Sequence, residues 1–242
     1  LIALGSSKSV LEKFKALYGT ELVMVDDTVN IVLRPIDSKF TDTTFCVFDI
    51  ETTGFNAGGA DSIIEIGAVL IKNGEIIDRF DEFIDPKRPL PYKIIELTNI
   101  TDDMLKGKDD EKTVVKRFMD WVKDYPMVAH NAKFDTSFIK MCHEKYKLGE
   151  FKNTVIDTLE LSRALDPELN KHSLSALVKR YDVPWEEDAH HRADYDAEGT
   201  AYVLTKMIKK LEARQFNNIN QLNDLIDKKD VHKHGRTFHV NL

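Results

Sequence analysis

Three short segments of the sequence place carboxylates where strands end or helices begin. The first holds Asp49 and Glu51 at the end of an apolar run, and side chains two residues apart on a strand project to the same side. Two carboxylates that lie close together repel each other unless a cation lies between them, and Mg²⁺ or Mn²⁺ accepts such oxygen ligands. An isolated pair of this kind is most often a solvated strand end, so its meaning depends on the other two segments.

The second and third segments add two carboxylates and a histidine. Asp135 follows a short buried run and opens a helix, where a carboxylate can also act simply as a stabilising charge worth about 0.3–1 kcal/mol. His191 precedes the helix expected over 193–211, and Asp196 lies in its first turn. A histidine, whose ordinary pKa is about 6.5, can act as a general base at neutral pH. Together these five residues are the groups that two-metal hydrolysis of a phosphodiester requires.

The elements that must position these residues alternate between strands and helices. Asn73-Gly74 separates two runs rich in Ile, Val and Phe, which is the strongest short-range signal of a β-hairpin. The first three strands are therefore expected to form an antiparallel meander, and the later alternation is typical of a mixed α/β sheet. We expect strands over 45–50, 62–71, 75–84, 126–130 and 154–156, and helices over 113–123, 134–142, 158–165, 173–180 and 193–211.

Three motifs resemble those of the DEDDh (DnaQ-like) 3′–5′ exonucleases. They are DIETTG at 49–54, HNAKFD at 130–135 and HRADYDA at 191–197, and the stretches IIEIGAV at 63–69 and LTNITDDML at 97–105 are also similar to family segments. The spacing of the third motif selects His191 over His190 and Asp196 over Asp194. The resemblance covers roughly residues 44–211. It implies an RNase H-like α/β fold, with a mixed five-stranded sheet (an antiparallel meander of three strands plus two parallel strands) flanked by helices.

The resemblance also implies a role for each motif residue. Asp49, Glu51 and Asp196 would hold the first of two divalent metal ions (Mg²⁺ or Mn²⁺). Asp49 would bridge to the second, with Asp135 helping through bound water. His191 would take the proton from the attacking water, and the product would be a nucleoside 5′-monophosphate. Six residues would contact or shape the substrate site: Thr52 (through its backbone) and Glu65 at the terminal sugar, Phe55 and Phe134 at the base, and His130 and Asn131 around it. Core packing of the two phenylalanines and a purely structural Asn131 remain alternatives.

A narrower similarity concerns the flanks. ELVMVDDTVNIV at 21–32 and INQLNDLI…TFHVNL at 219–242 resemble the sequence around the proofreading insertion of PolC-type replicative polymerases, in which the exonuclease interrupts a PHP domain. This similarity implies an exonuclease domain over 41–211 between two fragments of a split PHP domain, over 1–40 and 212–242. The partners would be the polymerase and PHP portions and a single-stranded or frayed 3′ end of DNA.

Two other functions share these motifs. A free-standing DEDDh nuclease that trims RNA or short oligonucleotides would carry the same five residues. An inactive nuclease fold kept as a docking module would be expected to lack at least one of these five residues, whereas this sequence has all five. Other polar residues have plainer interpretations: Asp157 as a helix cap, His232, His234 and His239 as exposed residues, and Lys206, Lys209 and Lys210 as a solvated helix face.

Composition excludes several classes of protein. The chain has 242 residues, of which 42% are hydrophobic, too many for a disordered protein. No apolar stretch approaches the roughly 20 residues that span a bilayer, and no basic segment precedes the opening apolar run. We therefore expect a cytoplasmic protein with no membrane partner and no signal peptide, in which Cys46 and Cys142 are buried thiols. The net charge of −7 argues against strong binding along a duplex, although part of this acid would be the metal site itself.

Overall fold

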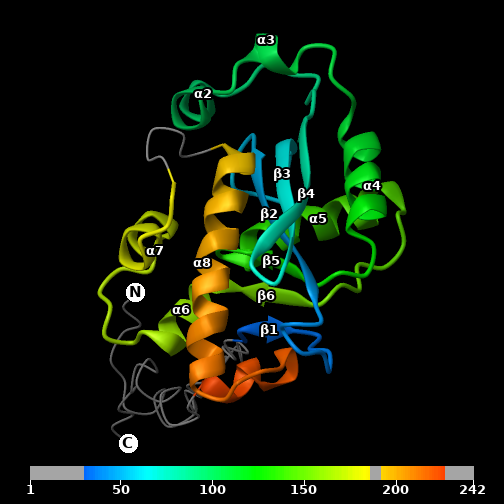
Figure 1. Ribbon diagram of the computed structural model, residues 1–242. Coiled ribbons are helices and arrows are strands. Elements are labelled where there is room, and N and C mark those ends of the chain that lie inside the picture. Colours follow the sequence, from blue (N-terminus) through cyan, green and yellow to red (C-terminus); the bar gives the residue numbers. More distant parts are fainter. Residues whose placement is uncertain (1–29, 186–191, 227–242) are drawn as a thin grey trace, which may run out of the picture.

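The computed structural model describes residues 30–185 and 192–226, and its centre is a mixed sheet of six strands (Figure 1). The order across the sheet is β1-β6-β5-β2-β3-β4. The strands are β1 (Val32–Leu33), β2 (Thr44–Thr52), β3 (Ile63–Lys72), β4 (Glu75–Phe83), β5 (Met127–Ala129) and β6 (Val155–Asp157).

The antiparallel meander predicted from the sequence is confirmed. β3 pairs with β2 on one side and with β4 on the other, both antiparallel. Asn73 and Gly74 form the β3–β4 turn with φ values of 52° and 81°. Positive φ at both central residues is the backbone that a tight two-residue hairpin requires.

The two predicted parallel strands are also confirmed. β5 lies parallel to β2, and β6 lies parallel to β5. Parallel neighbours need a crossover, which the chain makes with α4 (Glu111–Val122) before β5 and α5 (Ala132–Tyr146) before β6. β1 adds a short sixth strand, antiparallel to β6, to the five that were expected.

Helices cover both faces of the sheet, so β2 buries both sets of its alternating side chains. Phe45 and Val47 face the cluster that includes α8 (Ala193–Ala213), whereas Cys46 and Phe48 face the cluster that includes α4 and α5. The remaining helices are α2 (Tyr92–Thr98), α3 (Asp102–Leu105), α6 (Thr158–Leu165), α7 (Leu174–Tyr181) and the 3₁₀ helix η2 (Ile219–Leu225).

The start of α8 lies directly against β3. A Cβ atom added to Gly67 would lie 2.1 Å from the backbone of Ala193 and Asp194, a separation that no real side chain tolerates. Gly67 therefore permits the close approach of helix and strand. Because Asp49 is paired with Gly67 across the sheet, this approach brings the first turn of α8 to the end of β2.

The two ends of the molecule are built differently. At one end, α2 and α3 lie beyond the sheet, at the same end of the molecule as the start of α8 (Figure 1). At the other end, residues 30–40 and 217–226 lie side by side. Asn223 Oδ1 accepts hydrogen bonds from the backbone N–H groups of Ile31 and Val32 at 2.9 and 3.0 Å. Both segments contribute to the α8-side core, through Ile31, Val32, Ile219 and Leu222. The domain limits at residues 40 and 211 stay a prediction.

Several predictions lie outside the described residues: the role of His191, the interpretation of His232, His234 and His239, and most of both flanks. Within the described part, Cys46 and Cys142 are buried, as expected. None of the helices there combines the length and the apolar character needed to cross a bilayer.

Candidate active site

A cleft of about 320 Å³ opens where β2 ends. Its floor holds the predicted carboxylates Asp49, Glu51, Asp135 and Asp196, and its walls include Thr52, Phe55, His130 and Phe134. A second hollow, of about 380 Å³, lies beside the β3–β4 turn and is lined by residues such as Phe40, Ile71 and Ile208. Because only the first hollow gathers several carboxylates, we take it as the candidate active site.

Three of the carboxylates converge on one point. Asp49 and Glu51 project from the same face of β2, as strand alternation predicted, and Asp196 comes from the first turn of α8. Each offers an oxygen atom, and these three atoms lie within 4.8 Å of one another. The spacing suits a shared cation, since divalent metals take carboxylate oxygens from several side chains. Asp49, Glu51 and Asp196 are therefore the residues placed to hold a metal ion.

Asp135 completes the acidic floor from the first turn of α5. Its side chain is buried, and the backbone amides of Asp135 itself and of Ile50 favour the charged form of its carboxylate. Burial nevertheless raises the pKa of Asp135 to about 8. The carboxylate therefore lies beside the end of β2, although Asp135 is far from Asp49 and Glu51 along the chain.

The electrostatics of the floor favour a cation. Burial raises the pKa of Asp49 well above its ordinary value, and the charges of Asp135, Asp196 and Glu51 raise it further. Burial and the nearby charges of Glu65 and Asp196 likewise raise the pKa of Glu51 to about 9. Desolvated like charges are stable only when protons or cations neutralise them. The donor set therefore fits the divalent ions that the sequence predicted.

Aromatic rings form one wall of the cleft. Phe55 is 81% exposed, unusually high for a large apolar side chain, and its ring lies 6.2 Å from that of Phe134, centroid to centroid. Phe134 is partly buried and also packs against Phe138. Ile94 and Leu97 of α2 also line the cleft, and sequence reasoning singled out neither of them. An exposed ring such as that of Phe55 offers a stacking surface to a nucleobase.

Thr52 and His130 also line the cleft, but their side chains are already engaged. Thr52 Oγ1 donates to the carbonyl oxygen of Gly54 at 2.6 Å. His130 Nδ1 lies 3.0 Å from Thr158 Oγ1, and burial lowers its pKa to about 4, so the ring is neutral near pH 7. Asn131 adopts left-handed backbone at the start of α5 and donates its N–H to Asp157 Oδ1 at 3.1 Å. Asp157 also accepts from Leu159 N, which confirms its predicted role as a helix cap.

Glu65 lies beside the cluster and not in the wall of the cleft. Its side chain is fully buried, and its oxygens accept hydrogen bonds from Arg192 Nη2 at 2.7 Å and from Ala193 N at 3.1 Å. Glu65 therefore holds the start of α8 on β3. The contact with a terminal sugar stays a prediction for this residue.

The beginning of α7 was missed as part of the site. Ser173, Leu174 and Ser175 line the cleft, and Ser173 caps the helix by accepting from Ala176 N at 3.4 Å. A serine ahead of apolar residues at helical spacing is a recognised start signal, so the helix could be predicted. The position of this helix against the cleft could not be predicted from the sequence.

Comparisons with known proteins identify similar sequences and structures. A family model described as "Exonuclease" (RNase T) matches residues 46–204. The chain is 46% identical to the PolC-type DNA polymerase III of Listeria monocytogenes and 45% identical to that of Bacillus cereus, each over 94% of this chain. It spans only 16% of the length of these relatives.

Solved structures show the same fold. Exonuclease X, in a complex with 5′-overhanging duplex DNA, is 27% identical, with a TM-score of 0.57 over 75% of this chain and 98% of that one. The nuclease domain of 3′hExo, a DEDDh family member bound to rAMP, gives a TM-score of 0.60 at 21% identity, over 73% of this chain and 96% of that one.

Proposed function

Because the chain belongs to the RNase T family of exonucleases, and is a 3′–5′ exonuclease homologous to part of PolC-type DNA polymerase III, we propose that it proofreads DNA. In this proposal it removes nucleoside 5′-monophosphates one at a time from a single-stranded or frayed 3′ end. The observation that carries the proposal is the convergence of Asp49, Glu51 and Asp196 in a cleft that is also lined by the exposed Phe55 ring and the partly buried Phe134 ring. The similarity to the polymerases favours DNA over RNA as the substrate.

We infer that the four carboxylates hold two divalent ions, Mg²⁺ or Mn²⁺. When bound, such ions neutralise the acidic floor, lower the pKa of water and stabilise charge on the attacked phosphate. Asp49, Glu51 and Asp196 would hold the first ion, and Asp49 and Asp135 would contribute to the second. This assignment agrees with the raised pKa values of Asp49, Glu51 and Asp135, since groups that resist ionisation alone are stabilised by a nearby cation.

The remaining residues orient the substrate and move a proton. His191 would take the proton of the attacking water as a bond forms between the water oxygen and phosphorus. The bond from phosphorus to the 3′ oxygen of the preceding nucleotide would then break, and that oxygen would take a proton from solvent water to become a new 3′ hydroxyl. The Thr52 backbone would contact the terminal sugar, and Phe55 and Phe134 would stack against the terminal base. His130, neutral and bonded to Thr158, would shape the site without adding charge.

A cleavage assay tests the proposal. The protein is incubated with Mn²⁺ or Mg²⁺ and either a DNA primer with a mismatched 3′ nucleotide, the matched primer, or an RNA oligonucleotide. We expect stepwise shortening from the 3′ end, faster for the mismatched primer, with nucleoside 5′-monophosphates as products. Faster cleavage of RNA would favour an RNA-trimming nuclease, and inertness toward all three substrates with cation bound would favour a docking module.

The polymerase context is part of the proposal. The high identity over 94% of the chain supports residues 41–211 as an exonuclease inserted between two PHP fragments, at 1–40 and 212–242, within a cytoplasmic replicative polymerase. Detection of the native polypeptide by antibody would test this. A polypeptide much longer than this chain, which also extends primers, is expected, whereas a free polypeptide of this length would contradict the insertion.

A further inference from the structure

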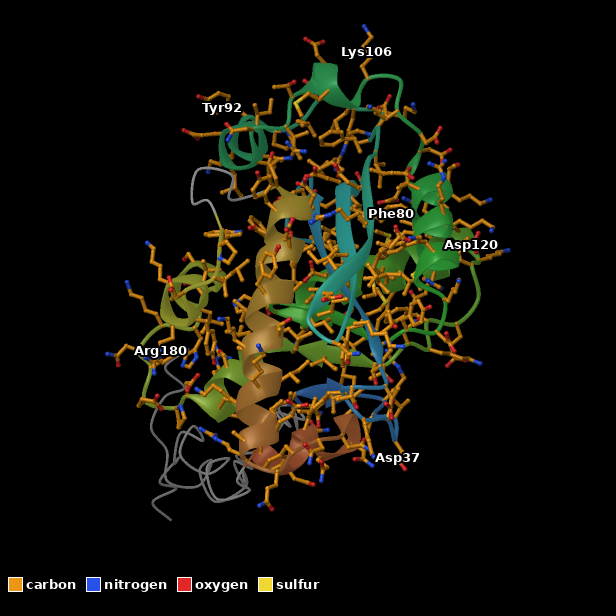
Figure 2. All side chains as sticks on the ribbon, in the orientation of Figure 1. Asp37, Phe80, Tyr92, Lys106, Asp120 and Arg180 are labelled. Atoms are coloured by element: carbon orange, nitrogen blue, oxygen red, sulfur yellow. The ribbon has the colours of Figure 1, made fainter. Side chains whose placement is uncertain are left out.

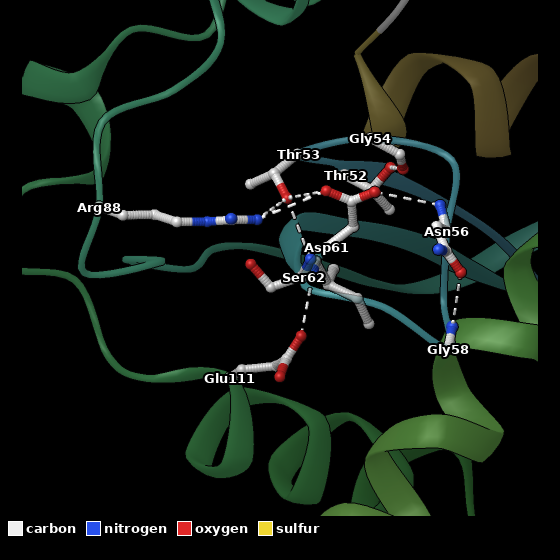
Figure 3. Close-up of polar contacts among 10 residues, drawn as sticks. Thr52, Thr53, Gly54, Asn56, Gly58, Asp61, Ser62, Arg88 and Glu111 are labelled. Carbon is white, nitrogen blue, oxygen red and sulfur yellow. Dashed lines mark hydrogen bonds and ion pairs between the residues drawn. The ribbon is translucent and has the colours of Figure 1, made fainter.

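A hydrogen-bond network holds the loop that follows β2 and carries Phe55 (Figure 3). Asp61 is at its centre. Its Oδ1 accepts from Thr53 Oγ1 at 3.2 Å, and its Oδ2 accepts from Asn56 N at 3.1 Å. Since Thr53 precedes Phe55 and Asn56 follows it, one carboxylate ties both sides of the exposed ring.

A second segment of the chain reinforces this network. Arg88 lies beyond β4 and reaches across to the loop (Figure 3), where its Nη2 donates to Thr53 Oγ1 at 2.6 Å and lies 3.5 Å from Asp61 Oδ1. Thr53 Oγ1 also accepts from Ser62 N at 3.0 Å, and the Thr53 side chain is buried. The loop is therefore closed at its base by three interacting side chains.

Gly54 lies directly against the side chain of Asp61. A Cβ atom at this position would lie 2.4 Å from Asp61 Oδ2, so the backbone rests directly on the Asp61 carboxylate. The carbonyl oxygen of Gly54 accepts from Thr52 Oγ1 at 2.6 Å. Thr52, Thr53 and Gly54, the three residues between Glu51 and Phe55, therefore each make at least one of these contacts.

We propose that Asp61, supported by Arg88, is a positioning residue that presents Phe55 to the terminal base of the substrate. Asp61 does not line the cleft, so it acts through the loop. An exposed ring on an unconstrained loop loses conformational freedom when a base stacks on it, and a ring held in place beforehand avoids that loss. This inference rests on the proposed function, because it assigns the geometry of the substrate wall of that same site.

The test is a double-mutant cycle with steady-state kinetics on a single-stranded DNA oligonucleotide in Mn²⁺. We expect Asp61→Ala to raise KM on the order of tenfold, with kcat changed less than about twofold. Phe55→Ala is expected to raise KM by a similar factor. In the Phe55→Ala background, Asp61→Ala should have little further effect, because the residue it positions is absent. If Asp61 had a merely structural role, Asp61→Ala would lower the melting temperature, and the effects of the two substitutions on KM would be additive.

Asp37→Ala is the matched control. Asp37 is an exposed aspartate that accepts side-chain hydrogen bonds from Asn218 and Asn220, and it lies far from the α2 end of the molecule, where Tyr92 is labelled (Figure 2). Its replacement should leave KM unchanged. If Asp61→Ala does not fold, Arg88→Ala replaces it in the cycle. This variant leaves Asp61 in place and should raise KM by a smaller factor.

Two results would overturn the inference: additive effects of Asp61→Ala and Phe55→Ala, or an Asp61→Ala variant whose KM equals that of the wild type. A wild-type protein that cleaves no DNA would instead remove the proposed function. The two failures are therefore distinguishable within one set of measurements.

Discussion

Buried carboxylates occur in two settings in this molecule, and their neighbours differ. Asp166, buried at the end of α6, accepts hydrogen bonds from Lys210 and from Tyr181 Oη. Glu111, at the start of α4, is bound by Lys145 Nζ at 2.9 Å and by Ile63 N at 2.9 Å. At the end of β2, the charges that shift the pKa of Asp49 all belong to other carboxylates.

The difference separates carboxylates whose charge is balanced by a lysine from the carboxylates that we propose bind metal. A buried carboxylate bound to a lysine has its charge balanced within the fold, so it can tie two elements together. A group of buried carboxylates that mainly repel one another destabilises the folded protein until a cation binds. Such destabilising groups are typical of functional sites. Glu65 stands between the two settings: it is bound by Arg192, yet its charge raises the pKa of Glu51.

The largest expected effect comes from breaking the acidic group at the end of β2. Asp49→Asn keeps the shape of the side chain and removes its charge, so cleavage should fall by about a thousandfold or more, equivalent to about 4 kcal/mol. In the absence of metal, the melting temperature of this variant should be no lower than that of the wild type, because a repulsive charge has been removed. Cleavage rates and thermal unfolding measure the two effects. Wild-type activity in this variant would refute the ligand role of Asp49.

Removal of His191 should leave the acidic group intact and still slow the reaction. As a general base contributes about 10²–10⁴-fold, His191→Ala should lower kcat within that range while Mn²⁺ affinity, measured by titration calorimetry, stays near that of the wild type. Weakened Mn²⁺ binding with little loss of kcat at saturating metal would instead make His191 a metal ligand.

Cation binding should stabilise only the protein whose acidic group is complete. At a free Mn²⁺ concentration one hundred times Kd, the wild type should gain about 2.7 kcal/mol, which for a chain of this size corresponds to roughly 5–10 °C in Tm. The Asp49→Asn variant should gain much less. Equal shifts in both proteins would place the bound Mn²⁺ elsewhere.

The smallest expected effect comes from the buried carboxylate that is paired with a lysine, Asp166. Lys210→Met leaves the buried Asp166 without its lysine, and the free energy of unfolding at pH 7 should fall by about 2 kcal/mol, since Lys210 itself is partly exposed. Burial raises the pKa of Asp166, but the hydrogen bonds from Lys210 and Tyr181 outweigh it and leave the pKa below its ordinary value.

This pKa shift sets the pH dependence of that variant. A carboxyl group whose pKa is lowered by folding contributes stability above its unfolded pKa of about 3.9 and loses it as the pH falls through the folded value. The stability difference between the wild type and Lys210→Met should therefore narrow below about pH 4. Denaturant unfolding curves at several pH values measure it, and a difference independent of pH would mean that Asp166 is not the group involved.

Local signals in the sequence predicted most of the fold. The Asn73-Gly74 hairpin, the five main strands and the long helix ending at Ala213 follow from turn chemistry and periodicity. α2 and α3 were not predicted, because 7 and 4 residues are too few to show a helical period. Nothing in the two-residue sequence of β1 indicated that it would join the sheet beside β6.

The supports of the site were less predictable than its acidic residues. Asp61 and Arg88 are 27 residues apart, and Glu65 and Arg192 are 127 residues apart. No periodicity links positions so distant, so neither pair could be found by reading along the chain. Glu65 was expected at a sugar, and its burial against Arg192 became visible only in the folded protein.

The sequence by itself determined the chemistry and the local geometry. It supplied the carboxylates, and strand alternation put Asp49 and Glu51 on one face whatever the rest of the chain does. The tertiary structure decided that α8 crosses that same face, with Gly67 allowing its first turn close enough to bring an oxygen of Asp196 within 4.8 Å of oxygens of the other two carboxylates. Such a meeting depends on packing between distant elements, and packing is set by how all the side chains fill the core together.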